Sequence, residues 1–281
     1  MDIRDVRDEE VIPHNGLALQ IIFERQESLM VQYKQIEKFP DWPFKLNNKA
    51  NQTLLKDFIS RTIEELGEAH DWVLPNLEMF SKNQVDVEAL KKNIWGLNEE
   101  LGDMMHFMVE TLIVSGITVD QIKAYYLKFI NDNQILPAYY LKNLSDDFSI
   151  MDMMFALAST ENFVEGYQRN NSRCYTVDGT VFPANSSTQA GRLIGPQLMS
   201  DLNHLSWAFT LNMQRVRTKL KNKPWKQTGM ETNEGEYIEW LFKSIRSLFQ
   251  ILELLGLGTD GLYTIYIKKN IVNQKRIATK Y

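Results

Sequence analysis

Residues 64–72 spell EELGEAHDW, and residues 99–107 spell EELGDMMHF, so the chain contains the same Glu-Glu-Leu-Gly-acid cluster twice. Around the second copy, apolar residues recur at spacings of three and four: Leu101, Met104, Met105, Met108 and Leu112. This spacing gathers them into one stripe along a helix. We therefore predict that each cluster lies on an amphipathic helix whose apolar stripe packs into a core.

The acids within each cluster are spaced to share a helix face. Glu65 and Glu68 are three residues apart, as are Glu100 and Asp103, and side chains at that spacing are neighbours on a helix. If the two helices pack together, four carboxylates converge and repel one another unless a positive charge lies among them. Oxygen ligands suit a hard divalent ion, so the sequence predicts a Mg2+ site.

The alternative is an ordinary solvated helix face. Two features argue against it: a mid-helix glycine in both clusters, which costs about 1 kcal/mol relative to alanine, and the absence of lysines four residues after the acids. The glycines are Gly67 and Gly102. His106 follows Asp103 by three residues. It fits either a role near the acids or an interior, hydrogen-bonded histidine, and the sequence leaves both open.

Helical periodicity also dominates the rest of the chain, and clear β alternation is rare, so we predict an all-α helical bundle. The predicted helices cover residues 18–39, 51–74, 85–116, 118–134, 197–220, 236–256 and 261–278. Asn51 is the expected cap of the second helix, which should end or kink near Asp71 because Pro75 follows. The polar stretch from Tyr167 to Pro196 predicts a long loop.

The chain also contains an internal repeat. Residues 111–134 align without gaps on residues 251–274, and seven of the aligned positions are identical. We predict a single domain over 1–281, with repeat one at about 51–134, an insertion at about 135–195 and a degenerate repeat two at about 196–276. Extended towards the N-terminus, the same alignment places Glu239 on Glu99 but Trp240 on Glu100 and Lys243 on Asp103. The second half has therefore lost the acidic cluster.

Composition restricts the function classes. The net charge of −5 argues against a general nucleic-acid binder, which would show a basic stripe. One cysteine, Cys174, excludes a disulfide framework within the chain and fits a reducing compartment. The first residues have no apolar core typical of a secretory signal, and no apolar run is long enough to span a membrane. We expect a cytoplasmic protein that has neither a membrane nor a nucleic-acid partner.

The two clusters resemble the signature of the all-α nucleotide pyrophosphatase superfamily, which includes MazG proteins and dimeric dUTPases. That signature is Glu-Glu-x-x-Glu followed at a distance by Glu-x-x-Asp. The pair His106–Phe107 looks like the dimeric dUTPase branch, as does the run Lys269, Asn270, Asn273, Arg276 near the end, and LALQ ending at Gln20 resembles a motif on that branch's first helix. The resemblance covers most of the chain except roughly residues 135–195.

The resemblance implies a homodimer of degenerate helical repeats that hydrolyses a nucleoside triphosphate, dUTP or a related pyrimidine, to the monophosphate and pyrophosphate. It implies these roles: metal ligands Glu65, Glu68, Glu100 and Asp103; water orientation or deprotonation by Glu64 or Glu99; phosphate binding by Lys269, Asn270, Asn273 and Arg276; base contacts by Gln20 and Phe107. Lysine and arginine near the end of a helix also stabilise its dipole, the alternative explanation for the cations.

The chain departs from the family pattern at several positions. Ile277 replaces the glutamine that usually follows the arginine, and Glu24 stands where the first helix of the family has asparagine. These departures concern base specificity more than reaction type. The rivals are a dCTP-specific, modified-nucleotide-specific or MazG-like pyrophosphatase, and a non-catalytic helical dimer that uses the fold for binding.

Overall fold

The structure is a computed structural model that describes residues 2–81, 86–133, 149–160, 163–164, 167–168, 174–177, 180–183, 196–221 and 231–279. Within these ranges, eight α-helices make up the molecule: α1 (Ala18–Glu37), α2 (Lys49–Ser81), α3 (Val87–Val114), α4 (Val119–Asn133), α6 (Ile150–Thr160), α8 (Pro196–Lys219), α9 (Glu234–Leu254) and α10 (Thr259–Ala278). Two short 3-10 helices precede them: η1 (Ile3–Asp5) and η2 (Asp8–Glu10). The prediction of an all-α helical bundle is confirmed.

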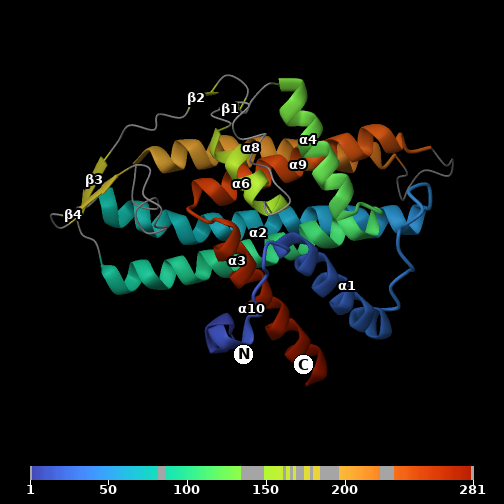
Figure 1. Cartoon of the computed structure of the whole chain (residues 1–281), viewed down its shortest axis with the longest axis horizontal. Helices are drawn as coiled ribbons and strands as arrows, with labels where there is room; N and C mark the ends of the chain where they lie inside the picture. The colour runs from blue at the N-terminus through green and yellow to red at the C-terminus, as the bar shows by residue number, and fades with distance from the viewer. Residues whose placement is uncertain are drawn as a thin grey trace.

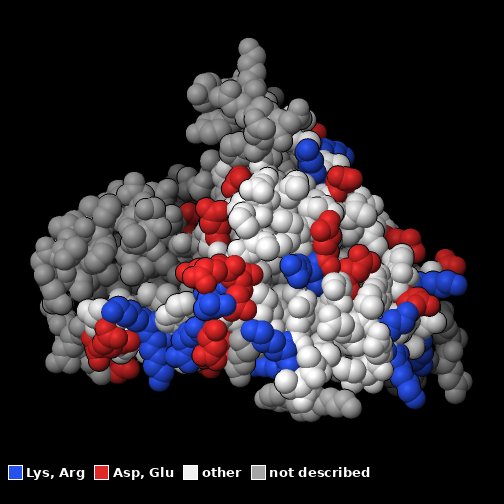
Figure 2. Space-filling model, turned by 60° about the horizontal axis from the view of Figure 1, so that its bottom comes forward, with Lys and Arg blue, Asp and Glu red and all other residues white. Residues whose placement is uncertain are grey.

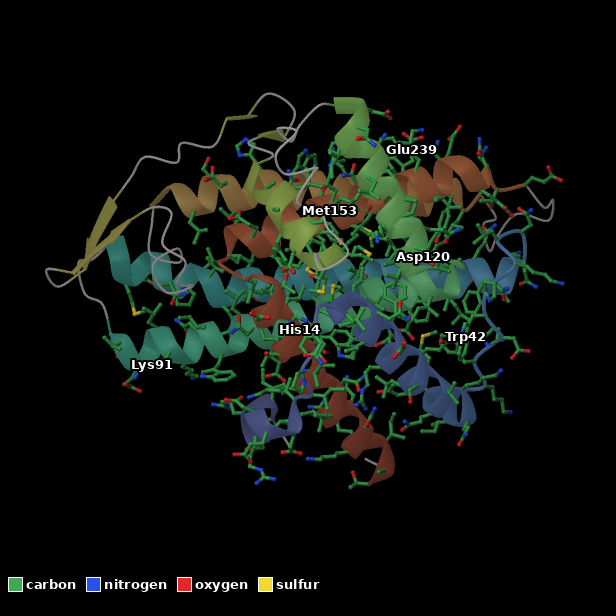
Figure 3. The ribbon with its side chains drawn as sticks, viewed as in Figure 1. His14, Trp42, Lys91, Asp120, Met153 and Glu239 are labelled. Carbon is green, nitrogen blue, oxygen red and sulfur yellow. The ribbon has the colours of Figure 1, made fainter. Side chains whose placement is uncertain are left out.

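The helices pack as two long pairs. Figure 1 shows α2 and α3 side by side along the long axis, with α8 and α9 running along one side of them. On the other side α1 and α10 contact each other and both contact α3. Met153 of α6 is buried where α6 meets α9 (Figure 3). None of the helices in the described part of the chain is long and apolar enough to cross a membrane.

The apolar stripe predicted for α3 is its buried face. All five predicted residues are at most 2% exposed: Leu101, Met104, Met105, Met108 and Leu112. Burying each such side chain stabilises the fold by about 1.5–3 kcal/mol. Asp86 begins the helix by accepting hydrogen bonds from the backbone N–H groups of Glu88 and Ala89. The same stripe leaves the acids of α3 on a neighbouring face.

The predicted N-terminal cap and bounds of α2 are wrong. The helix begins earlier than predicted, and Asn48 caps it instead of Asn51, because the Asn48 side chain accepts hydrogen bonds from the N–H groups of Ala50 and Asn51. It also does not end near Asp71 but continues through Pro75 to Ser81. A proline in a helix interior costs about 3 kcal/mol, and the long pairing of α2 with α3 offsets that cost.

The region predicted as an insertion and a loop contains structure that the sequence did not indicate. Helix α6 was not predicted. Between Tyr167 and Pro196, where a loop was expected, three strands lie: β2 (Tyr167–Gln168), β3 (Cys174–Val177) and β4 (Thr180–Pro183). β2 pairs antiparallel with β1 (Phe163–Val164), and β3 pairs antiparallel with β4, with Tyr175 opposite Phe182. The rest of the predicted loop lies outside the described residues.

The two halves of the predicted repeat share one helix junction. Gly116 after α3 and Gly256 after α9 occupy corresponding positions and have φ of 77° and 83°, a left-handed conformation that glycine adopts without strain. In both junctions, the residue after the glycine donates its backbone N–H to the carbonyl five residues earlier at 2.9 Å, from Ile117 to Leu112 and from Leu257 to Leu252. The junctions agree, while duplication of the whole half stays a prediction.

The last helix of each predicted half packs on a long helix of the other half: α10 contacts α3, and α4 contacts α9. α10 packs on α3, where a Cβ at Gly102 would lie 3.0 Å from the Ile265 side chain. At the corresponding positions of the other pair, Phe242 of α9 stacks on Tyr125 of α4 with ring centroids 4.4 Å apart. Glycine thus allows a close approach in one place, whereas two aromatic rings fill the space in the other.

Candidate functional site

Three acids from the two sequence clusters come together where α2 packs on α3. One carboxylate oxygen each from Glu65, Glu100 and Asp103 lies within 4.8 Å of the other two, and all three side chains are partly buried. Glu68 is exposed beside them. Its charge nevertheless acts on Glu65 and Glu100. The predicted convergence of acids on one site therefore occurs, with three acids at its centre and Glu68 at its margin.

The carboxylates are in an environment that penalises their charge. Burial, followed by the charges of Asp103, Glu68 and Glu100, raises the pKa of Glu65 to about 8. Burial is also the main cause that raises the pKa values of Glu100 and Asp103. A bound cation would reverse this penalty, since it favours the ionised forms. The donor set, three carboxylates on rigid helices, fits a hard divalent cation.

The raised pKa of Glu65 predicts a specific dependence of stability on pH. A carboxyl whose pKa is higher in the folded than in the unfolded chain binds its proton more tightly when folded. In metal-free buffer, the free energy of unfolding should therefore fall as pH rises from about 4.5 towards 8, the interval between the ordinary and the raised pKa of Glu65. Urea unfolding in EDTA at several pH values measures the slope.

Glu65→Gln should make that slope shallower, because the amide cannot ionise. Glu64→Gln is the matched control, since Glu64 is the exposed neighbour of Glu65 on the same helix. Equal slopes for the wild type and Glu65→Gln would contradict the assignment of the repulsion to this cluster.

Trp72 fixes one of the three acids. Its indole Nε1–H donates to Glu100 Oε1 at 3.2 Å. The ring lies against the backbone of α3 at Gly96, where an added Cβ would lie only 2.2 Å from the ring. Gly96 therefore makes room for the tryptophan that orients Glu100. Neither residue was predicted to have this role.

The mid-helix glycines of the two clusters have different surroundings. Gly102 lies under Ile265 of α10, so it serves helix packing next to the acids. An added Cβ at Gly67 would meet nothing within 4 Å. The surroundings of Gly102 require a glycine beside the acids, whereas those of Gly67 do not.

Lys269 of α10 provides a cation inside the cluster. Its ammonium contacts Asp103 Oδ2 at 2.7 Å and Glu99 Oε1 at 2.8 Å, and its side chain is only 5% exposed. Burial lowers the pKa of Lys269, but Asp103 and Glu99 outweigh that effect and raise it. The pKa of Asp103 stays raised despite this contact, because its burial outweighs one ammonium. Lys269, predicted to bind phosphate, pairs with protein carboxylates in this structure.

The two acids predicted to act on water differ in position. Glu99 is partly buried and held by Lys269 beside Asp103. Glu64 is exposed and is not one of the three gathered carboxylates. In the second half the counterpart Glu239 pairs with Lys243 at 2.6 Å. Figure 3 shows Glu239 at the edge of the bundle opposite the N-terminal segment, away from α10.

A pocket of about 410 Å³ adjoins the acidic cluster and shares Asp103 with it. Aromatic side chains from α1, α2 and α3 contribute to its wall, namely Tyr33, Phe58 and Phe107, and Asn273 of α10 lines it as well. The guanidinium of Arg61 lies 5.6 Å from the centre of the Phe107 ring. The pocket is lined by aromatic rings together with polar and charged side chains, which suits a planar ring that carries polar groups.

His106 is an interior residue that supports this pocket. Its Nδ1 lies 2.7 Å from Gln26 Oε1 and donates to it, because an amide oxygen only accepts. The Tyr266 hydroxyl donates to the same oxygen at 2.7 Å, and its ring stacks on His106. Burial, then the charge of Lys269, lowers the pKa of His106 to about 3. His106 is thus an interior, hydrogen-bonded histidine that also lines the pocket beside the acids, so it combines the two roles that the sequence left open.

The remaining predicted site residues are divided between pocket and scaffold. Gln20 is exposed, donates to Glu24 at 3.0 Å and does not line the pocket, whereas Gln26, further along the same helix, does. Asn270 is 1% exposed, and its amide donates to the Arg25 carbonyl, so it joins α10 to α1 in the interior. Arg276 acts electrostatically on Asp103, and its predicted contact with phosphate stays a prediction.

No protein-family model, curated protein or solved structure matches the chain. The function of the site must therefore be inferred from its own geometry and chemistry. Gln26 and Gly96 are functional candidates that the sequence did not reveal, and the hydrogen bond from Trp72 to Glu100 was not predicted either. Gln26 lies six residues after Gln20 and therefore on a different face of α1. That spacing is the one sequence signal that could have indicated Gln26.

Proposed function

We propose that the chain is a magnesium-dependent nucleoside triphosphate diphosphatase that acts on dUTP or a related pyrimidine nucleotide. The observation that carries the proposal is the adjacency of a carboxylate cluster to an aromatic pocket, with Asp103 common to both. A nucleoside triphosphate needs both features: an apolar, polar-edged place for its base and a cation site for its phosphates. Among the described residues, Glu65, Glu100 and Asp103 are the one group of acids gathered closely enough to hold a metal ion.

The chain's own residues would divide the work as follows. Glu65, Glu100 and Asp103 would hold Mg2+, which when bound neutralises phosphate charge and lowers the pKa of water. Glu99, held in place by Lys269, can accept a proton from an attacking water molecule. Asn273, which lines the pocket, and Arg276, which acts electrostatically on Asp103, would donate hydrogen bonds to the phosphates. Phe107 offers a ring face to the base.

The rivals predict different results from one experiment. The wild-type chain is incubated with each dNTP, with Mg2+ or with EDTA, and the products are separated by ion-exchange chromatography. We expect a monophosphate and pyrophosphate from dUTP in Mg2+ and neither in EDTA. Turnover of dCTP, of a modified nucleotide or of many nucleotides would instead indicate the dCTP-specific, modified-nucleotide-specific or MazG-like alternative.

A melting curve in Mg2+ distinguishes an enzyme from a binding protein. A ligand present at about 100 times its dissociation constant stabilises a fold by about 2.7 kcal/mol, which corresponds to roughly 5 °C for a chain of this size. A rise in melting temperature without turnover of any nucleotide would favour a non-catalytic binding protein. No rise and no turnover would remove the support for a cation site.

A further inference from the structure

The N-terminal segment, residues 2–10, is fastened along α10 beside the acidic cluster. Ile3 and Val6 are each 1% exposed and pack with Val272 of α10. Asp8 contacts Lys268 at 2.6 Å, and Glu10 contacts Lys275 at 3.4 Å. We call residues 2–10 the N-terminal strap. Three contacts with α10 hold the strap in place. The apolar contact at Val272 lies between the ion pairs at Lys268 and Lys275.

The helix geometry of α10 places this strap next to the site. Lys268, Val272 and Lys275 are spaced by four and three residues, so they form one face of α10. Lys269 follows Lys268 by one residue and therefore lies on the adjoining face, where it contacts Glu99 and Asp103. On the side of the molecule that carries the N-terminus and α10, acidic and basic side chains alternate over a small area (Figure 2).

Arg4 is the basic residue that the strap brings to the acids. Its side chain is 58% exposed and contacts the carboxylate of Asp2, to which its Nε–H donates at 3.0 Å. The charge of Arg4 interacts with Glu99, and the charge of Asp2 interacts with Lys269. Because η1, which contains Arg4, contacts α10, the pair of Arg4 and Asp2 lies within electrostatic range of the pair of Lys269 and Glu99.

Three lysines of α10, including Lys269, which was predicted to bind phosphate, are already paired with carboxylates. Lys268 pairs with Asp8, Lys269 with Glu99 and Asp103, and Lys275 with Glu10. A triphosphate still needs donors at the end of the site away from the pocket. Phe107, which lines the pocket, and Glu99 are eight residues apart on α3. At roughly 1.5 Å per residue they are about 12 Å apart along the helix. Glu99 therefore lies at the end of the site away from the pocket.

We propose that Arg4 binds the terminal phosphates of the substrate, with Asp2 occupying its guanidinium when no substrate is present. A guanidinium binds phosphate oxygens and carboxylate oxygens through the same forked pair of N–H donors. A phosphate can therefore take the place of Asp2 without rearranging the strap. This inference rests on the proposed function, because it assigns a residue to the phosphate end of the same site.

The test compares Arg4→Gln with Arg7→Gln. Arg7 lies on the same strap, is 74% exposed and pairs with Glu9 and Glu10. Arg4→Gln should raise KM for the nucleotide at least about tenfold, the loss expected for charge-assisted hydrogen bonds, and should weaken inhibition by pyrophosphate equally. Arg7→Gln should leave both values at the wild-type level. Equal values for the two variants would overturn the proposal.

Asp8→Asn provides a second test, because it loosens the strap without touching Arg4. It should raise KM in the same direction as Arg4→Gln, whereas a fall in KM would show that the strap obstructs the site, and would overturn the proposal. If the wild type hydrolyses no nucleotide, the proposed function fails by itself. Calorimetric binding of magnesium pyrophosphate to Arg4→Gln and Arg7→Gln then decides the role of Arg4: weaker binding only in Arg4→Gln supports it, and equal binding refutes it.

Discussion

Changing Glu65 and Glu100 together to glutamine is expected to lower kcat/KM for the nucleotide by more than about 100-fold. Loss of a residue that only supports a metal ligand commonly costs about 10- to 100-fold, so loss of two ligands should cost at least the upper value. Glutamine keeps the shape of glutamate but removes the negative charge that the cation needs. Steady-state kinetics at saturating Mg2+ measure the effect.

Two controls separate this effect from unfolding. Glu64→Gln removes an exposed acid from the same helix and should keep most of the activity. In EDTA the double variant should melt no lower than the wild type, because it relieves repulsion between carboxylates whose charge is penalised by burial. Turnover retained in the double variant would rule out these two acids as metal ligands.

Gly96→Ala should strongly destabilise the fold. The new Cβ would lie 2.2 Å from the Trp72 ring, so the indole must leave its place on α3 and release Glu100. Overpacking of this kind costs about 3 kcal/mol. Urea unfolding should show that loss, together with a weaker stabilisation of the variant by Mg2+.

Gly67→Ala is the matched comparison and should act in the opposite direction. An added Cβ at Gly67 meets nothing within 4 Å, and the glycine has no positive φ that alanine would strain. Alanine stabilises a helix interior by up to about 1 kcal/mol relative to glycine. A loss of stability in Gly67→Ala, or none in Gly96→Ala, would show that the packing around Trp72 is not as described.

Sequence periodicity was sufficient for the long helices because it reports which face of each helix is buried. The stripe from Leu101 to Leu112 predicts α3 and its buried face correctly. Periodicity failed where local sequence preferences compete with contacts between residues that are far apart in the chain. Pro75 should end a helix, yet α2 continues past it along α3. The short strands β3 and β4 lie in a polar stretch that carries no alternating pattern strong enough to predict them.

The site could be predicted only as far as each helix alone determines it. Spacing correctly brought Glu65, Glu100 and Asp103 onto facing sides of two helices. It could not show that Lys269, far along the chain from Glu99, would lie against that acid. Spacing also could not show that Asn270 faces α1, because the sequence of one helix does not reveal which helix packs against each of its faces.

The packing of α10 on α3 makes the acidic centre depend on a helix far along the chain from the acids. During synthesis Glu65, Glu100 and Asp103 emerge well before Lys269, since α10 follows all the other described helices. Until α10 docks on α3, these carboxylates lack the Lys269 ammonium beside them. A chain without α10 would carry the acids that we propose as metal ligands but would lack Lys269 beside them. The proposed activity would therefore require α10 to be docked on α3.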